Sequence, residues 1–143
     1  MMDRQTDDPF DLQRFVDAQD RVYPAVLDEL RAGAKRTHWI WFVFPQLRGL
    51  GHSPTAHHFG IASLAEATAF LEHEGLGPRL RECARLLLAV QGRSAREILG
   101  QPDDLKVRSS MTLFARAGQE PVFGEVLDKF YQGRDDPATL QML

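Results

Sequence analysis

Apolar residues recur at intervals of three and four positions along most of this chain, which is the spacing of amphipathic helices. In the first stretch these residues are Leu12, Phe15, Val16, Val22, Val26, Leu27 and Leu30. Pro24 would break a continuous helix, so the pattern predicts two helices that meet near Asp20, with Pro24 in the first turn of the second. Gly33 is expected to end that second helix.

Helix-capping residues divide the rest of the chain into further short helices. Ser53 precedes a proline, as an N-cap often does, whereas Ser63 and Ser94 are each followed three residues later by a glutamate, which is the capping-box pattern. Asp136 with Pro137 is expected to begin a last short helix. Between these caps, apolar stripes with helical spacing cover residues 79–91, 102–117 and 123–130.

The aromatic block HWIWFVF, residues 38–44, does not show this pattern. Its composition alone favours a buried strand, but the sequence offers no second convincing strand to pair with it. A short, fully buried helix at the centre of a helical domain fits the rest of the chain better. We therefore predict an all-α fold, a single compact domain over residues 1–143. It should contain about seven to nine short helices around this central aromatic-rich segment, with residues 1–9 as a flexible N-terminal tail.

Composition and charge exclude several classes of protein. The 43% apolar and 26% charged residues are typical of a soluble globular protein. The formal net charge of -3 lacks the basic excess of a nucleic-acid-binding module, so we do not expect a nucleic acid as partner. Cys83 is the single cysteine and cannot form an internal disulfide, and no apolar run reaches the length of a membrane span. We expect a cytoplasmic protein that does not span a membrane and has neither a metal nor a cofactor, and the sequence leaves the oligomeric state open.

The aromatic block and its flanks contain a first group of candidate ligand-binding side chains. On a helix, Lys35 and His38 would lie near one face, at the edge of an aromatic wall that includes Trp41. The alternative for the aromatic residues is that they simply fill the core. Gln46 follows in the glycine-containing stretch PQLRGLG, where it could contact a ligand or satisfy a buried backbone group. His57 is a further polar candidate, because the histidines here lack metal-binding spacing.

The segment PDDLKVRSSMTLF, residues 102–114, contains a second group. Asp103, Lys106 and either Ser109 or Ser110 follow one another at steps of three and four, so they would share a helix face. Such a row could bind an anionic or polyol ligand near a helix start, where the dipole favours negative charge. The alternative is a surface ion pair between Asp103 and Lys106, with small serines that allow close helix packing. A serine nucleophile would need a base within reach, and no GxSxG motif is present.

The strings HWIWFVFPQLRGLG and DLKVRSSMTLF carry a resemblance to a known family. The chain resembles a bacterial family of domains of unknown function whose members are often labelled calpastatin-like. The resemblance implies a mainly α-helical single domain, and it implies no activity, substrate or catalytic residue. There is also a looser similarity in class to small helical bacterial domains that process ADP-ribose or related N-glycosides.

Our leading hypothesis is a domain that binds, and could also hydrolyse, a small polar ligand such as a nucleotide, an ADP-ribose-like molecule or a sugar phosphate. In this hypothesis Trp41 stacks on a ring, Lys106 and Ser109 hold an anionic group, and His38 or Asp104 serves as acid or base. The other candidate ligand-binding residues are Lys35, Gln46, His57, Asp103 and Ser110. The alternative is a non-enzymatic protein-interaction or regulatory domain, in which the same residues support the fold. Whether the protein is an enzyme stays open at this point.

Overall fold

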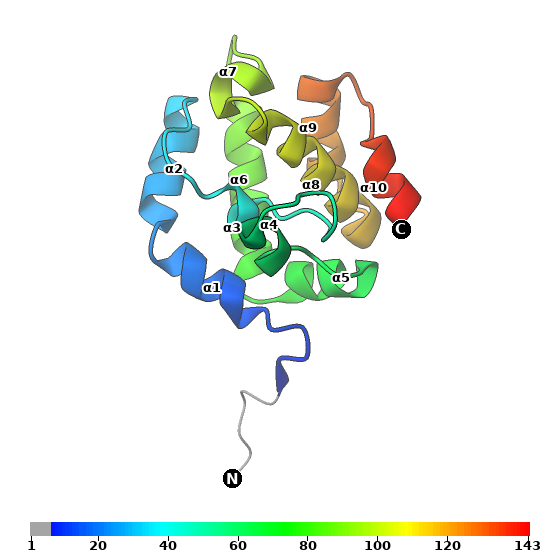
Figure 1. Cartoon of the computed structure of the whole chain (residues 1–143). Helices are drawn as coiled ribbons and strands as arrows, with labels where there is room; N and C mark the ends of the chain where they lie inside the picture. The colour runs from blue at the N-terminus through cyan, green and yellow to red at the C-terminus, as the bar shows by residue number, and fades with distance from the viewer. Residues whose placement is uncertain (1–6) are drawn as a thin grey trace.

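Ten helices account for most of residues 7–143, which are the residues that the computed structural model describes (Figure 1). They are α1 (Gln13–Asp20), α2 (Tyr23–Ala32), α3 (Ile40–Val43), α4 (Pro54–His58), α5 (Leu64–Glu72), α6 (Leu76–Ala89), α7 (Ala95–Leu99), α8 (Asp103–Gly118), α9 (Pro121–Tyr131) and α10 (Pro137–Met142). The predicted all-α, single compact fold is confirmed, with one helix more than the upper limit of the prediction. The first six residues of the predicted N-terminal tail lie outside the described residues. In the remainder of that tail, the Asp8 carboxylate accepts hydrogen bonds from the backbone amides of Leu12 and Gln13 at 2.7 and 3.0 Å.

The predicted junction between the first two helices is confirmed. Helix α1 ends at Asp20, and α2 has Pro24 in its first turn, where a missing amide hydrogen costs nothing. Gly33 caps α2 with a φ of 67°, a left-handed conformation that glycine adopts without strain. The chain after α2 therefore turns sharply, and this turn leads into the segment that carries Lys35.

The serine caps also lie where the sequence places them, with one difference. Ser94 and Glu97 form a complete capping box at the start of α7, with bonds of 2.8 and 3.1 Å. Ser63 accepts from the amide of Glu66 at 3.2 Å, but the Glu66 carboxylate does not return to Ser63. It accepts instead from the amide of Ala62 and from the Arg14 guanidinium, at 2.9 and 2.7 Å. Because the Glu66 carboxylate forms this buried ion pair with Arg14 of α1, it does not form the second bond of the predicted capping box.

The aromatic block forms a short helix as predicted, but α3 is buried only in part rather than fully. Trp39, which precedes α3, and Phe44, which follows it, are buried, whereas Trp41 is half-buried. Helix α3 packs against α1, α6 and α8. Among the described residues the only β-bridge pairs Leu47 with Ile61. Neither residue belongs to the aromatic block, so the block has no strand partner.

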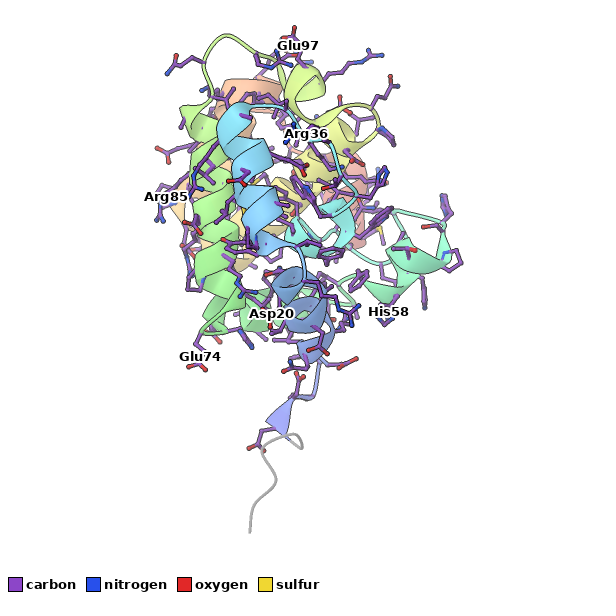
Figure 2. All side chains as sticks on the ribbon, turned by 90° about the vertical axis from the view of Figure 1, so that its left-hand side faces the viewer. Asp20, Arg36, His58, Glu74, Arg85 and Glu97 are labelled. Carbon is purple, nitrogen blue, oxygen red and sulfur yellow. The ribbon has the colours of Figure 1, made fainter. Side chains whose placement is uncertain are left out.

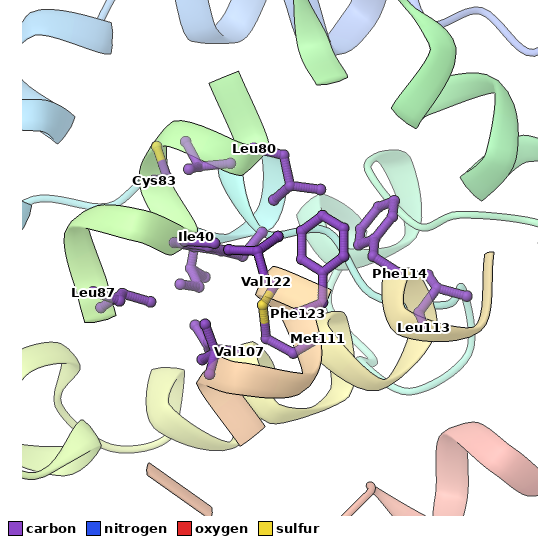
Figure 3. Packing of buried hydrophobic residues seen from close by; sticks show 14 of the residues in the cluster. Ile40, Leu80, Cys83, Leu87, Val107, Met111, Leu113, Phe114, Val122 and Phe123 are labelled. Carbon is purple, nitrogen blue, oxygen red and sulfur yellow. The ribbon is translucent and has the colours of Figure 1, made fainter. Parts of the chain in front are cut away.

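Helix α8 lies at the centre of the packing, in contact with α5 and α9, and α6 in turn contacts α2, α5 and α9. Figure 3 shows Ile40 of α3, Leu80 of α6, Met111 of α8 and Phe123 of α9 in the same core. Each such side chain contributes about 1.5 to 3 kcal/mol by its removal from water. The first turns of α8 are thus held by this core against α3 on one side and α9 on another.

The described residues contain no helix with both the length and the apolar composition needed to cross a membrane. Over the same stretch, 7–143, no three His, Cys, Asp or Glu side chains gather in a way that could hold a metal ion.

Candidate functional site

Asp103, in the first turn of α8, joins two lysines from different parts of the chain. Its Oδ2 atom lies 2.8 Å from Nζ of Lys35, which belongs to the segment after α2. Its Oδ1 atom lies 3.5 Å from Nζ of Lys106, one turn further along α8. Two ammonium groups thus share one carboxylate near the N-terminus of a 16-residue helix, whose first turn also contains Asp104. The helix dipole adds to the attraction of this position for an anion.

Lys35 is firmly held in this cluster. Its side chain is 5% exposed, and besides the ion pair Nζ donates to the carbonyl of Thr37 at 2.5 Å. The same atom lies 5.1 Å from the centroid of the Trp39 ring, and the backbone amide of Lys35 donates to the carbonyl of Ile98 at 2.7 Å. With its ammonium enclosed in this way, Lys35 acts as an anchor for Asp103.

Lys106 is the accessible cation of the pair. Its side chain is 24% exposed, and its bond to Asp103 is the longer of the two. Nζ of Lys106 lies 5.0 Å from the centroid of the half-buried Trp41 ring, at cation–π distance. The surface here therefore presents one ammonium group beside one aromatic ring.

Glu29 of α2 holds the segment that carries Lys35. Its buried carboxylate accepts from the amides of Arg36 and Thr37 at 2.7 and 2.9 Å and from the Thr37 hydroxyl at 2.6 Å. A fourth bond, of 3.0 Å, comes from the indole of Trp39. Burial by itself would raise the pKa of Glu29, but these hydrogen bonds outweigh it and lower the pKa to about 2. The carboxylate is therefore ionised at neutral pH and fully occupied by this segment.

Three other predicted residues of the first group do not contact this cluster through any hydrogen bond or ion pair among the described residues. His38 is exposed. The Gln46 carbonyl accepts from the amide of Ile61 at 2.9 Å, so its backbone serves the bridge between the two loops. His57 lines a separate cavity of about 380 Å³ with Arg48. Figure 2 shows His58, the neighbour of His57, well away from Arg36, the neighbour of Lys35.

The two candidate serines have different surroundings. Ser109 is bound to the C-terminal segment, because its hydroxyl donates to Oδ2 of Asp136 at 2.9 Å. Ser110 lies one turn after Lys106 on the same face of α8, and its side chain is fully buried. Its Oγ atom has no hydrogen-bond partner among the residues that the structure describes.

Asp104 turns away from Asp103, because consecutive residues on a helix differ by about 100°. It lines a groove of about 330 Å³ between the start of α7, the first turns of α8 and the end of α9. Its Oδ1 atom is buried there without a partner among the described residues. The structure therefore brings Lys35, Trp41, Asp103 and Lys106 together and places Asp104 in a different site.

Sequence reasoning did not single out Glu29 or Trp39 as residues that support the cluster. The four-residue spacing of Lys35 and Trp39 is no signal for their cation–π contact, because residues 34–39 are not helical. Nothing local marks Glu29, since its donors come seven to ten residues later along the chain.

The family model described as "Protein of unknown function (DUF1810)" matches residues 9–143. The crystal structure of the conserved hypothetical protein Rv1873 from Mycobacterium tuberculosis is similar to this chain, with a TM-score of 0.94. The two sequences are 60% identical, over 95% of this chain and 98% of that one. A search of curated proteins found no match. The match over nearly the whole chain, which agrees with the resemblance carried by the two sequence strings, shows that this protein belongs to the DUF1810 family of proteins of unknown function.

Proposed function

We propose that this domain binds a small anionic ligand that contains a ring, such as a nucleotide or an ADP-ribose-like molecule, at the pair formed by Lys106 and Trp41. The observation that carries the proposal is the position of the Lys106 ammonium beside an aromatic ring, on a side chain that is 24% exposed and lies 3.5 Å from Asp103. A phosphate group would take Lys106 as its partner through charge-assisted hydrogen bonds. The base of a nucleotide would pack against the Trp41 ring, either stacked on its face or edge-to-face.

Because Asp103 is shared by two lysines, Lys106 can leave it for a ligand at a small cost in free energy. Asp103 keeps its shorter bond to the enclosed Lys35 when Lys106 turns toward a ligand, so no carboxylate is left unpaired. The cluster is also rigid on the protein side, because Glu29 and the Lys35 ion pair fix the segment before α3. A preformed site of this kind loses little conformational entropy on binding.

The proposal is limited to binding. The acid or base considered for hydrolysis was His38 or Asp104, but Asp104 lines the groove toward α9, and His38 is exposed and forms no hydrogen bond or ion pair with the cluster among the described residues. We therefore assign no hydrolytic role to either residue.

Isothermal titration calorimetry with ADP-ribose and ADP tests the proposal on the wild type and on Lys106→Gln. We expect saturable binding to the wild type and an affinity at least about tenfold weaker for Lys106→Gln, because a hydrogen bond to a charged group contributes about 1.5 to 3 kcal/mol. Arg116→Gln is the matched control, since Arg116 is an exposed cation at the other end of α8. Circular dichroism establishes that each variant is folded.

Equal affinity of the wild type and Lys106→Gln would exclude the Lys106–Trp41 pair as the binding site. Absence of binding to the folded wild type at millimolar ligand would reject the proposal altogether. It would favour the alternative, a protein-interaction domain in which the cluster only supports the fold.

A further inference from the structure

The ammonium of Lys35 is a buried charge beside the Lys106–Trp41 pair. An ammonium group has three N–H donors. Nζ of Lys35 lies 2.8 Å from Oδ2 of Asp103, 2.5 Å from the Thr37 carbonyl and 5.1 Å from the centroid of the Trp39 ring, so these three partners account for its donors. Its enclosed side chain has no donor left for a ligand. Lys35 can therefore influence a bound ligand only without touching it.

Asp103 is the side chain that connects Lys35 to the site. Its carboxylate is mostly buried and lies 2.8 Å from Nζ of Lys35 and 3.5 Å from Nζ of Lys106. The first distance is that of a charge-assisted hydrogen bond, whereas the second is beyond the normal range of N–H···O bonds. The carboxylate therefore has its hydrogen-bonded counter-charge in Lys35, and the Lys106 ammonium stays available.

The nearest backbone amides cannot replace Lys35 as the donor to Asp103. The amides of residues 104–106, the next three on α8, already donate to backbone carbonyls of the preceding turn at 2.9 to 3.2 Å. A mostly buried carboxylate that loses its counter-charge is costly. Without the Lys35 ammonium, Lys106 is the cation that can pair with Asp103, because the two residues are three positions apart on one helix face.

We propose that Lys35 is a positioning residue of the Lys106–Trp41 site, which holds the Asp103 carboxylate and thereby leaves the Lys106 ammonium available to an anionic ligand. This inference rests on the proposed function, and it adds a residue that determines the affinity of the site without contacting the ligand. If Lys106 were the only cation of Asp103, a phosphate group would have to break that ion pair in order to bind. Binding would be weaker as a result.

Calorimetric titration of Lys35→Met with ADP tests the proposal, because methionine keeps an unbranched side chain and lacks the ammonium. We expect an affinity about tenfold weaker than that of the wild type, the effect of one hydrogen bond to a charged group. The double variant Lys35→Met/Asp103→Asn should bind ADP at least as tightly as the wild type, because Lys106 then has no carboxylate to pair with. Lys35→Gln removes the same charge with a polar side chain and is measured in parallel, and circular dichroism establishes that each variant is folded.

Arg36→Gln is the matched control. Arg36 is the next residue along the chain, and its exposed side chain forms no hydrogen bond or ion pair with Asp103 within the described residues. Its substitution should change the affinity by less than about twofold. An equal loss in Arg36→Gln and Lys35→Met would show that only net charge matters, and would overturn the proposal. A double variant that binds as weakly as Lys35→Met would also overturn it, because Lys35 would then act by holding the shape of its segment.

The crystal structure of ligand-free Lys35→Met separates this inference from the proposed function. We expect Nζ of Lys106 to lie within about 3 Å of a carboxylate oxygen of Asp103, the distance of a charge-assisted hydrogen bond. An unchanged distance of 3.5 Å would contradict the proposal, whether or not ADP binds. If ADP binds the wild type and Lys35→Met equally well, this inference fails and the proposed function stands. If ADP does not bind the wild type at all, the proposed function fails, and the distance alone decides whether Lys35 keeps Asp103 from Lys106.

Discussion

At the scale of single residues, Glu29 supports the candidate site without being part of it. Four donors from residues 36 to 39 converge on its carboxylate, and three of those four belong to Thr37 and Trp39. The segment that follows α2 has no helix or strand hydrogen bonds of its own. The Glu29 carboxylate therefore fixes residues 36 to 39 next to Lys35, whose own backbone amide donates to the carbonyl of Ile98.

Replacement of Glu29 by Gln should lower the free energy of unfolding by about 2 to 3 kcal/mol at pH 7, as expected for the loss of a buried, hydrogen-bonded charge. The pKa of Glu29 is about 2 in the folded protein, below its ordinary value of 4.5. The carboxylate therefore stabilises the fold fully above the unfolded pKa, and this contribution is lost as the pH falls through about 4.5 to about 2. Urea unfolding of both proteins at pH 7 and pH 3 measures the difference, which should shrink by more than half at pH 3.

Asp28→Asn is the matched control for that experiment. Asp28 precedes Glu29 on α2, and its 74% exposed side chain forms only a 3.8 Å surface pair with Arg31. Its substitution should change the free energy of unfolding by less than about 0.5 kcal/mol. An equal effect of the two substitutions, or a Glu29→Gln effect that does not change with pH, would contradict the role given to Glu29.

At the scale of elements, Asp136 links the C-terminal helix α10 to α8 through both its side chain and its backbone. Its Oδ2 atom accepts from Ser109 Oγ at 2.9 Å and from the hydroxyl and amide of Thr139, at 2.6 and 3.2 Å. The amide of Asp136 donates to the buried Thr112 hydroxyl at 2.9 Å. Asp136 is thus both the N-cap of α10 and its link to the core.

Asp136→Ala should destabilise the protein by about 1 to 3 kcal/mol, the sum of a lost N-cap and of buried hydroxyls left without an acceptor. Hydrogen exchange should show this first at the amide of Leu140, which closes the first turn of α10. Asp135→Ala removes an exposed neighbouring carboxylate and should leave both the stability and the exchange rate unchanged. If the two variants exchange at the same rate, Asp136 does not hold α10.

The helices themselves were predictable because their ends are marked locally. A serine followed by proline at residue 53 and the pair Ser94 and Glu97 form the bonds that their spacing indicates. Ser63 with Glu66 forms half of the expected box, because the partner of Glu66 is Arg14, 52 positions earlier in the chain. Sequence spacing shows which side chains can form a hydrogen bond within one turn. It does not show that a side chain from another helix, here Arg14, binds the same carboxylate instead.

At the scale of the whole molecule, the same limit governs the candidate site. Asp103 and Lys106 share a helix face, as their spacing predicts, and the fold brings Lys35 to them from the segment after α2. The environment of Asp104 depends on how α8 is rotated against α9, and that of Ser109 depends on where α10 docks. Tertiary packing sets both, so the periodicity of α8 places the two carboxylates on different faces but could not show which neighbours each face meets.

The aromatic core connects helices that are distant in sequence into one unit. The Phe70 ring lies 5.1 Å from that of Phe15 on α1 and 5.2 Å from that of Phe114 on α8, which in turn lies 6.0 Å from that of Phe123 on α9. All four rings are fully buried. Because these contacts link both ends of the chain through α5 and α8, we expect the domain to unfold in one cooperative step.

Phe70→Ala should therefore lower the free energy of unfolding of the whole domain by about 3 to 5 kcal/mol, the usual cost of the cavity left by a buried phenylalanine. Urea unfolding followed by tryptophan fluorescence and by far-UV circular dichroism measures this, and both signals should give one midpoint with an unchanged slope. Leu64→Ala, on the exposed side of α5, should cost less than about 0.5 kcal/mol. Separate midpoints for the two signals in the wild type would show that the helices around the tryptophans and the rest of the bundle unfold independently, and that the rings do not couple them.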